Sequence, residues 1–196
     1  SLLPILVNNS YNKIHSINKI KRLSLQDYFS YNRTPVVNKS YLVKISKKYN
    51  LDEKKLFQIL QFLKNYKTKK IPESFLHGDT DFTNYIFNKN KITGVIDFDQ
   101  SRLGDSLDEI VITALKISLN LDNGSFNKDK IVRFISKFKL NEVNKEKIDF
   151  YVYRFIFSSL LTFKEDKKLF KLITNYFINF YKIYQKDKEN VYLSFK

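Results

Sequence analysis

The side chains with the clearest chemical potential lie in one central stretch of the chain. Asp79 opens the pattern, Asn84 follows five residues later, and Asp97 comes at the end of an apolar run. Carboxylate and amide oxygens are hard ligands that suit Mg²⁺, and a carboxylate can also accept the proton of an attacking hydroxyl. An acid, an amide and a second acid in this order therefore indicate a site that holds a nucleophile and metal ions around a phosphate.

We assign provisional roles to these residues from their spacing. Asp79 is the candidate base, and a tight loop would return the oxygen of Asn84 to the same cavity. Asp97 is expected to end a strand that the run of residues 92–96 drives into the core. Asp99 would then point to the same side as Asp97 on extended backbone, as a second metal contact or as a solvated neighbour. A lone Asp in a loop is more often a turn former or a cap, so the joint pattern carries the interpretation.

Two neighbours and one distant histidine complete the candidates. His77 is expected to be structural, with its ring packed and hydrogen-bonded to backbone, rather than to carry a proton. Asp81 could be a metal or substrate neighbour, or a loop hydrogen-bonding group. His15 lies within a predicted helix and receives no chemical role.

The elements that must position this stretch are mainly helices. Apolar spacing near 3.6 residues predicts helices over 2–20, 40–49, 52–66, 107–121, 128–138, 145–163 and 168–184. Short apolar runs at 75–76, 85–87 and 92–98, with a turn at 88–91, predict a hairpin in the middle. The chain is therefore expected to be one mainly helical α+β unit. Its three parts are a helical segment (1–73), the catalytic loop with the hairpin (74–105), and C-terminal helices (106–196).

Composition excludes several classes of protein. The chain has 196 residues, no cysteine, and no apolar run of the roughly 18 residues that suggest a membrane span. Nothing at its start is typical of a signal peptide, so we expect a cytoplasmic protein. The net charge of +15 makes nucleic acid a possible partner. The lysines are scattered along predicted helix faces, however, which favours a solvated basic surface, and we do not expect a nucleic-acid or membrane partner.

Residues 76–110 resemble the signature of the aminoglycoside phosphotransferase and choline kinase superfamily, small-molecule kinases with a protein-kinase-like fold. The family pattern is a His-Gly-Asp-x-x-x-x-Asn loop, a strand ending in Gly-Val-Ile-Asp-Phe, and Gly-Asp with a further acid leading a helix. The corresponding residues are His77-Gly78-Asp79, Asn84, Gly94-Val95-Ile96-Asp97-Phe98 and Gly104-Asp105. The resemblance implies that Asp79 is the catalytic Asp and that Asn84 and Asp97 bind Mg²⁺ and, through it, ATP.

The chain departs from the family pattern in two places. Glu109 occupies the position of the last acid, usually Asp, which is thought to brace the catalytic loop, and Asp108 replaces an aromatic residue. The first glycine is Gly78, so no glycine-rich loop precedes the motif. Together with the absence of methionine, this predicts a fragment that holds the C-terminal lobe, with the β-rich N-terminal lobe missing upstream.

The predicted function is ATP- and Mg²⁺-dependent transfer of the γ-phosphate to a hydroxyl of a small molecule. The alternative is a non-catalytic kinase-like binding or regulatory module. The acceptor is expected to bind between the catalytic loop and the C-terminal helices. Tyr151, Tyr153, Phe155 and Phe157 are candidates for its wall, although a buried aromatic helix is the simpler and favoured explanation. The lysine-rich C-terminal helices disfavour a polycationic aminoglycoside.

Overall fold

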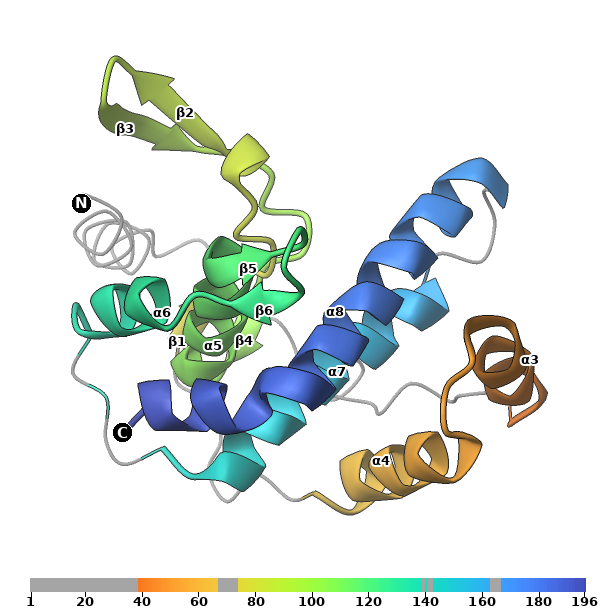
Figure 1. Ribbon diagram of the computed structural model, residues 1–196. Coiled ribbons are helices and arrows are strands. Elements are labelled where there is room, and N and C mark those ends of the chain that lie inside the picture. The colour runs from red at the N-terminus through yellow and green to blue at the C-terminus, as the bar shows by residue number, and fades with distance from the viewer. Residues whose placement is uncertain (1–38, 67–73, 139, 141–142, 163–166) are drawn as a thin grey trace.

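The computed structural model describes residues 39–66, 74–138, 140, 143–162 and 167–196 (Figure 1). Within them the fold is α+β, mainly helical with short antiparallel strand pairs, as expected from the sequence. The helix predicted over 2–20, with His15, lies outside the described residues. No helix of the described part is both long enough and apolar enough to cross a membrane.

The first two described helices form a pair at one end of the molecule. Helix α3 (Lys39–Tyr49) and helix α4 (Glu53–Asn65) follow the predicted boundaries closely. The Asp52 carboxylate accepts a hydrogen bond from the Lys55 N–H at 3.0 Å, which caps α4 as its position suggested. The buried face of α4 repeats at three- and four-residue intervals and packs towards helix α7.

Three helices enclose most of the core. These are α5 (Ser106–Ser118), α7 (Lys145–Thr162) and α8 (Lys167–Ser194), with α6 (Lys128–Ile135) packed on α5 and α8. Helices α7 and α8 run side by side along the molecule (Figure 1). The core contains fully buried side chains from all three long helices, including Val111, Leu115, Val152, Phe180 and Tyr184. This core fixes α5, the helix that faces the candidate site.

Three helix ends differ from the prediction. Helix α6 ends at Ile135, before the predicted end at 138. Helix α5 ends at Ser118, because residues 119–120 leave it as strand β5 (Leu119–Asn120), which pairs with β6 (Ser125–Phe126). Helix α8 continues ten residues past the predicted end at 184. Its last turns still bury Val191, Tyr192 and Phe195, so the apolar period persists through the charged stretch 186–189.

The remaining strands surround the candidate catalytic loop. Strand β1 (Ser74–Leu76) pairs with β4 (Arg102–Gly104), which was not predicted. Strand β2 (Tyr85–Asn88) pairs with β3 (Lys91–Val95) in the predicted hairpin, whose turn includes Lys89 at a φ of 54°. A short 3₁₀ turn, Phe82–Asn84, leads into β2.

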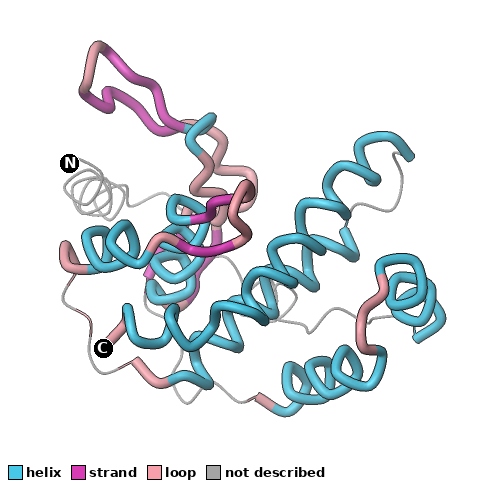
Figure 2. Tube along the Cα trace, viewed as in Figure 1, coloured by secondary structure: helices cyan, strands magenta, loops and turns pink. Residues whose placement is uncertain are grey.

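The hairpin does not enter the core, contrary to the prediction. It projects from the helical body (Figure 1, Figure 2). Ile92 is buried, but Phe87 is 51% exposed and Ile96 46% exposed. A two-stranded hairpin is too small to form a hydrophobic core of its own, so apolar residues on it remain exposed where no helix covers them. The run 92–96 was therefore read correctly as a strand and wrongly as a core strand.

Candidate active site

One face of α5 carries the candidate catalytic loop. Glu109, Thr113 and Lys116 lie four and three residues apart, so they share one side of the helix. Each contacts a different part of the loop over residues 77–81, as detailed below. The helix is fixed by the core, so this face holds the loop at several points along its length.

Glu109 holds the start of the loop. Its carboxylate accepts hydrogen bonds from the His77 N–H, 3.1 Å from each oxygen, and from the Gly78 N–H at 3.3 Å. Burial raises the pKa of Glu109 to about 7, against the opposing effect of these backbone hydrogen bonds and of the Arg102 charge. Both N–H groups point into the chain interior and require an acceptor there, which Glu109 provides.

Gly78 allows the loop to pass close to the turn that precedes β4. Its φ of 85° lies in the left-handed region. A Cβ atom at this position would stand 2.1 Å from the carbonyl oxygen of Gln100. Since that oxygen belongs to the backbone, no small side-chain movement would relieve the contact, and only glycine fits.

Thr80 and Thr113 join the middle of the loop to α5. Their hydroxyl oxygens lie 2.5 Å apart, a hydrogen bond in which either can donate. Thr113 is 3% exposed, so the bond is protected from water on the helix side. It fixes the loop between the two acids, Asp79 and Asp81.

The Asp79 carboxylate has a different partner on each oxygen. The Asn84 side-chain N–H₂ donates to Oδ2 at 3.1 Å and to the Asp79 carbonyl at 3.0 Å. The Lys116 ammonium lies 3.4 Å from Oδ1 and also 3.2 Å from Asp81 Oδ2. The Asp79 side chain is still 30% exposed, so an incoming hydroxyl can reach it. This geometry orients a carboxylate towards solvent, as a base requires.

His77 is fully engaged within the loop. Its Nε2 lies 2.8 Å from the Ile96 carbonyl oxygen, and its Nδ1 accepts a hydrogen bond from the Asp79 N–H at 3.3 Å. The ring also packs on Phe98, with centroids 4.5 Å apart. Nε2 and the ring connect the loop to the segment after β3, whereas Nδ1 bonds to backbone within the loop.

Asn84 and Asp97 are brought close through the backbone. The Ile96 N–H donates a hydrogen bond to the Asn84 backbone carbonyl at 3.0 Å, and Asp97 is the residue after Ile96. This bond therefore holds the backbones of the two candidate metal ligands near each other. Asn84 is buried, whereas Asp97 is exposed. Asn84 interacts with Asp79 only through its amide nitrogen, which leaves the amide oxygen of Asn84 for another partner.

The expected alignment of Asp99 with Asp97 is wrong. Asp97 has a φ of 62°, and Asp99 lies in a turn, so the backbone between them is not extended. The alternation of sides in a strand therefore does not apply. Within the described part of the chain, no three His, Asp or Glu side chains gather closely enough to hold a metal ion by themselves.

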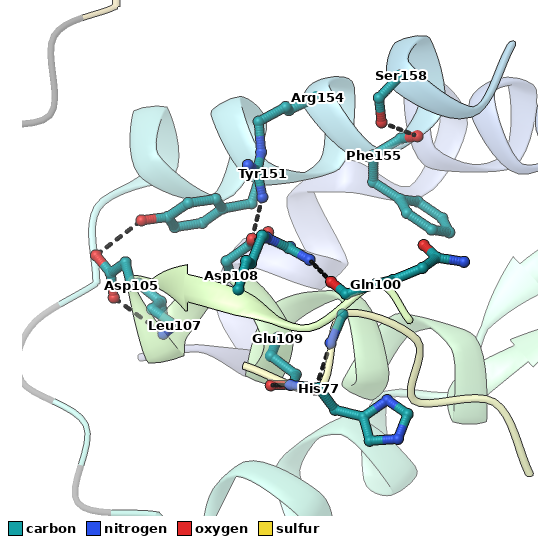
Figure 3. A network of polar contacts seen from close by, with 12 residues as sticks. His77, Gln100, Asp105, Leu107, Asp108, Glu109, Tyr151, Arg154, Phe155 and Ser158 are labelled. Carbon is teal, nitrogen blue, oxygen red and sulfur yellow. Dashed lines mark hydrogen bonds and ion pairs between the residues drawn. The ribbon is translucent and has the colours of Figure 1, made fainter. Parts of the chain in front are cut away.

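Asp105 and Asp108 organise the start of α5 rather than the loop (Figure 3). Asp105 caps the helix by accepting the Leu107 N–H at 3.0 Å and also accepts the Tyr151 hydroxyl at 2.7 Å. Burial alone would raise the pKa of Asp105, but the hydrogen bonds from Lys147, Tyr151 and Leu107 outweigh it and the pKa falls.

Asp108 is 4% exposed and binds two arginines, Arg102 of β4 at 2.8 Å and Arg154 of α7. A charge buried this deeply requires such partners. The position that departs from the family pattern thus connects a strand, α5 and α7.

One of the four aromatic residues suggested for the acceptor wall lies near the loop. The Phe155 ring is 5.8 Å from the Lys116 ammonium. Tyr151, Tyr153 and Phe157 are each at most 4% exposed and belong to the core, in agreement with the simpler explanation. Thr113 and Lys116 were not anticipated as site residues. Their spacing places them on the same helix face as Glu109, but it does not show that this face meets the loop.

The sequence was compared with known proteins. A family model described as the phosphotransferase enzyme family matches residues 13–128, more than half of the chain. No curated protein and no solved structure matches the chain. The family match confirms the resemblance to the aminoglycoside phosphotransferase and choline kinase superfamily drawn from the motifs. The candidate catalytic loop, the hairpin and α5 all fall within the matched residues, and the chain therefore belongs to the phosphotransferase enzyme family.

Proposed function

We propose that the chain forms the catalytic lobe of a small-molecule kinase, which transfers the γ-phosphate of ATP to a hydroxyl group. The observation that supports this most is the setting of Asp79. Its carboxylate is oriented by Asn84 and Lys116, anchored on both sides along the backbone, and open to solvent. In phosphoryl transfer the protein contributes mainly positioning and charge neutralisation, and this loop is built to position one carboxylate.

In this proposal Asp79 accepts the proton of the acceptor hydroxyl as the hydroxyl oxygen bonds to the γ-phosphorus of ATP. The bond from that phosphorus to the oxygen it shares with the β-phosphate breaks, and ADP leaves. Asn84 holds Asp79 through its amide nitrogen, so the carboxylate keeps its direction while the acceptor binds. His77 and Glu109 maintain the path of the loop. Asp81 lies beside the acceptor and shares Lys116 with Asp79.

Asn84 and Asp97 fit a magnesium ion that arrives with the nucleotide. Mg²⁺ is commonly held by one or two protein oxygen ligands together with substrate phosphates and water, rather than by a cage of protein ligands. An amide oxygen and one exposed carboxylate, adjacent through the Ile96–Asn84 hydrogen bond, suit that mode. When bound, the ion would neutralise charge on the phosphate oxygens. Asp99 remains a proposed second contact.

The nucleotide itself needs a further structural part. A kinase of this kind grips the phosphates with a glycine-rich loop and a strand lysine in a β-rich lobe. The sequence has only four glycines, the first of them Gly78 within the catalytic loop. We therefore propose that a nucleotide-gripping lobe works together with this chain, and that the exposed hairpin faces it.

Substitution of Asp79 tests the proposal. Asp79→Asn keeps the shape and the bond from Asn84 but removes the proton acceptor. We expect kcat for phosphate transfer to fall by about 10²–10⁴-fold with little change in the KM for ATP. The assay is nucleotide turnover by the intact protein against a panel of small hydroxyl compounds.

The matched control is Asp122→Asn, which changes an exposed acid on the turn between β5 and β6. It should leave turnover unchanged. Unchanged turnover in Asp79→Asn would contradict the assignment of Asp79. Absence of any turnover in the intact wild-type protein would instead favour the alternative, a non-catalytic kinase-like module.

A further inference from the structure

The surroundings of Lys116 have the composition of a binding site for a cation. Two carboxylates, Asp79 and Asp81, lie 3.4 and 3.2 Å from its ammonium nitrogen. The Phe155 ring lies 5.8 Å away, within the range of a cation–π contact. Charged hydrogen-bond acceptors combined with an aromatic face are what an ammonium group binds most favourably.

Lys116 is well placed to occupy that site permanently. Its side chain is 16% exposed, so most of its stem is covered by neighbouring residues. Thr113, one turn earlier on α5, is bonded to Thr80 and keeps the helix and the loop in register. The ammonium therefore belongs to a fixed part of the molecule and does not depend on a flexible surface chain.

The cation position beside Asp79 borders an aromatic cluster of α7 and α8. The Phe155 ring packs on the Phe177 ring of α8, with centroids 5.1 Å apart. The Tyr176 ring also packs on Phe177. Burial, and after it the charge of Asp81, raises the pKa of Tyr176 to about 12, so this tyrosine lies within the field of Asp81. The aromatic surface of α7 and α8 thus continues from the cation position.

We propose that Lys116 determines acceptor specificity by filling the cation position beside Asp79. An acceptor with an ammonium group near its hydroxyl would meet this fixed charge and find its natural partners already bound, which discriminates against it. The inference rests on the proposed function and narrows it: the acceptor is a neutral or anionic hydroxyl compound, and amino alcohols are rejected. Removing the ammonium should leave a vacancy for an external cation.

Chemical complementation tests the vacancy directly. Lys116→Ala removes three methylenes and the ammonium, the same atoms that propylammonium contains. We expect propylammonium to bind this variant saturably, at least tenfold more tightly than it binds the wild type or Lys116→Arg. Phe155 ring resonances should shift on titration, 1-propanol should produce no such shift, and adding Asp81→Asn should weaken binding at least tenfold. Calorimetry and NMR of the full chain provide the readouts.

Equal binding of propylammonium by the wild type and Lys116→Ala would overturn the proposal, as would binding that leaves Phe155 unperturbed. Lys116→Ser gives the same comparison if the alanine variant fails to fold. The titration requires no turnover, so its result is independent of the proposed function.

A second measurement addresses the acceptor class. Phosphate transfer from ATP to choline is compared with transfer to 3,3-dimethyl-1-butanol, its uncharged isostere. The ratio of kcat/KM should favour the neutral compound in the wild type and shift towards choline at least tenfold in Lys116→Ala. An unchanged ratio would overturn the specificity role. If no hydroxyl compound is phosphorylated, the proposed function fails while the propylammonium titration still decides whether Lys116 fills a cation site.

Discussion

The two halves of the candidate site are held very differently. The half that contains Asp79 is fixed by α5 at several points, through the backbone at Glu109, a hydroxyl pair at Thr113 and an ion pair at Lys116. The half that contains Asp97 lies between an exposed hairpin and a turn, and Asp97 itself is exposed. The first half is therefore preorganised by the helical body, while the second depends on what binds against it.

This contrast agrees with the chemistry proposed for each half. A base has to be in position before the acceptor arrives, since misplacement of a reacting group reduces the rate sharply. Metal ligands that act on a nucleotide-borne ion can take their final position when that ion binds. Substitutions in the two halves should consequently have separable effects on turnover and on stability.

After that of Asp79→Asn, the largest effect is expected from Asp97→Asn. Loss of a charged metal ligand should lower kcat by about 10²–10³-fold, since charge neutralisation at the phosphate is worth several kcal/mol. The melting temperature should stay within about 1 °C, because an exposed surface substitution changes stability by only a few tenths of a kcal/mol. Measurements of kcat and of the melting temperature on the same preparation check both expectations.

Asp99→Asn is the matched comparison for this prediction. Because Asp99 lies in a turn and is not aligned with Asp97, its substitution should cost much less turnover. A loss as large as that of Asp97→Asn would mean that the two acids act together despite the intervening left-handed residue.

The next effect concerns the anchored half. Gly78→Ala should destabilise the lobe by about 3 kcal/mol, because it combines a strained φ with a clash against backbone. Gly94→Ala in β3 is the control. Its Cβ would come closest to the flexible end of Ile86, at 3.3 Å, and would meet the rest of that side chain at ordinary van der Waals distance. Urea denaturation of both variants measures the difference. Equal losses of stability would show that the loop at Gly78 can relax, contrary to the anchoring described.

The smallest effect is a pH dependence that originates at Glu109. Its folded pKa of about 7 lies above the ordinary value of 4.5, so the folded state holds a proton that the unfolded state releases. Stability from this group is present below about pH 4.5 and is lost as pH rises through 7. The loss should be about 2 kcal/mol, below the upper limit of about 3 kcal/mol that the two pKa values imply.

Glu109→Gln removes this titration. Its free energy of unfolding, measured in urea at several values between pH 5 and pH 8, should therefore fall less with rising pH than that of the wild type. Parallel curves for the two proteins would place the pH dependence elsewhere.

Much of the fold could be predicted because local signals and tertiary packing agree. Asp52 marks the start of α4 as a capping residue, and the turn around Lys89 defines the hairpin. Strand β4 has no such signal: three residues that include an arginine and a glycine become a strand only because β1 lies beside them. The length of α8 was underestimated because four charged residues hide an apolar face that continues beyond them.

The candidate site, like the fold, could be predicted where local sequence signals determine it and not where tertiary packing does. The motif indicated which residues share a region, because the spacing of Asp79 and Asn84 reflects a local loop. The position of Lys116 could not be read in that way, since a lysine in the last turn of a helix usually indicates a favourable interaction with the helix dipole. Only the packing of α5 against the loop makes it a partner of Asp79. The left-handed backbone at Asp97 likewise had no signal in a residue type that tolerates it without requiring it.

The arrangement of Glu109, Thr113 and Lys116 on one helix face has a consequence for how such chains can diverge. A single inserted or deleted residue within α5 rotates everything beyond it by about 100° around the helix axis. Thr113 and Lys116 would then turn away from the loop while Glu109 stayed in place. Among related sequences, this helix should accept many exchanges of side chain on its other faces but keep a constant number of residues between the acid and the lysine.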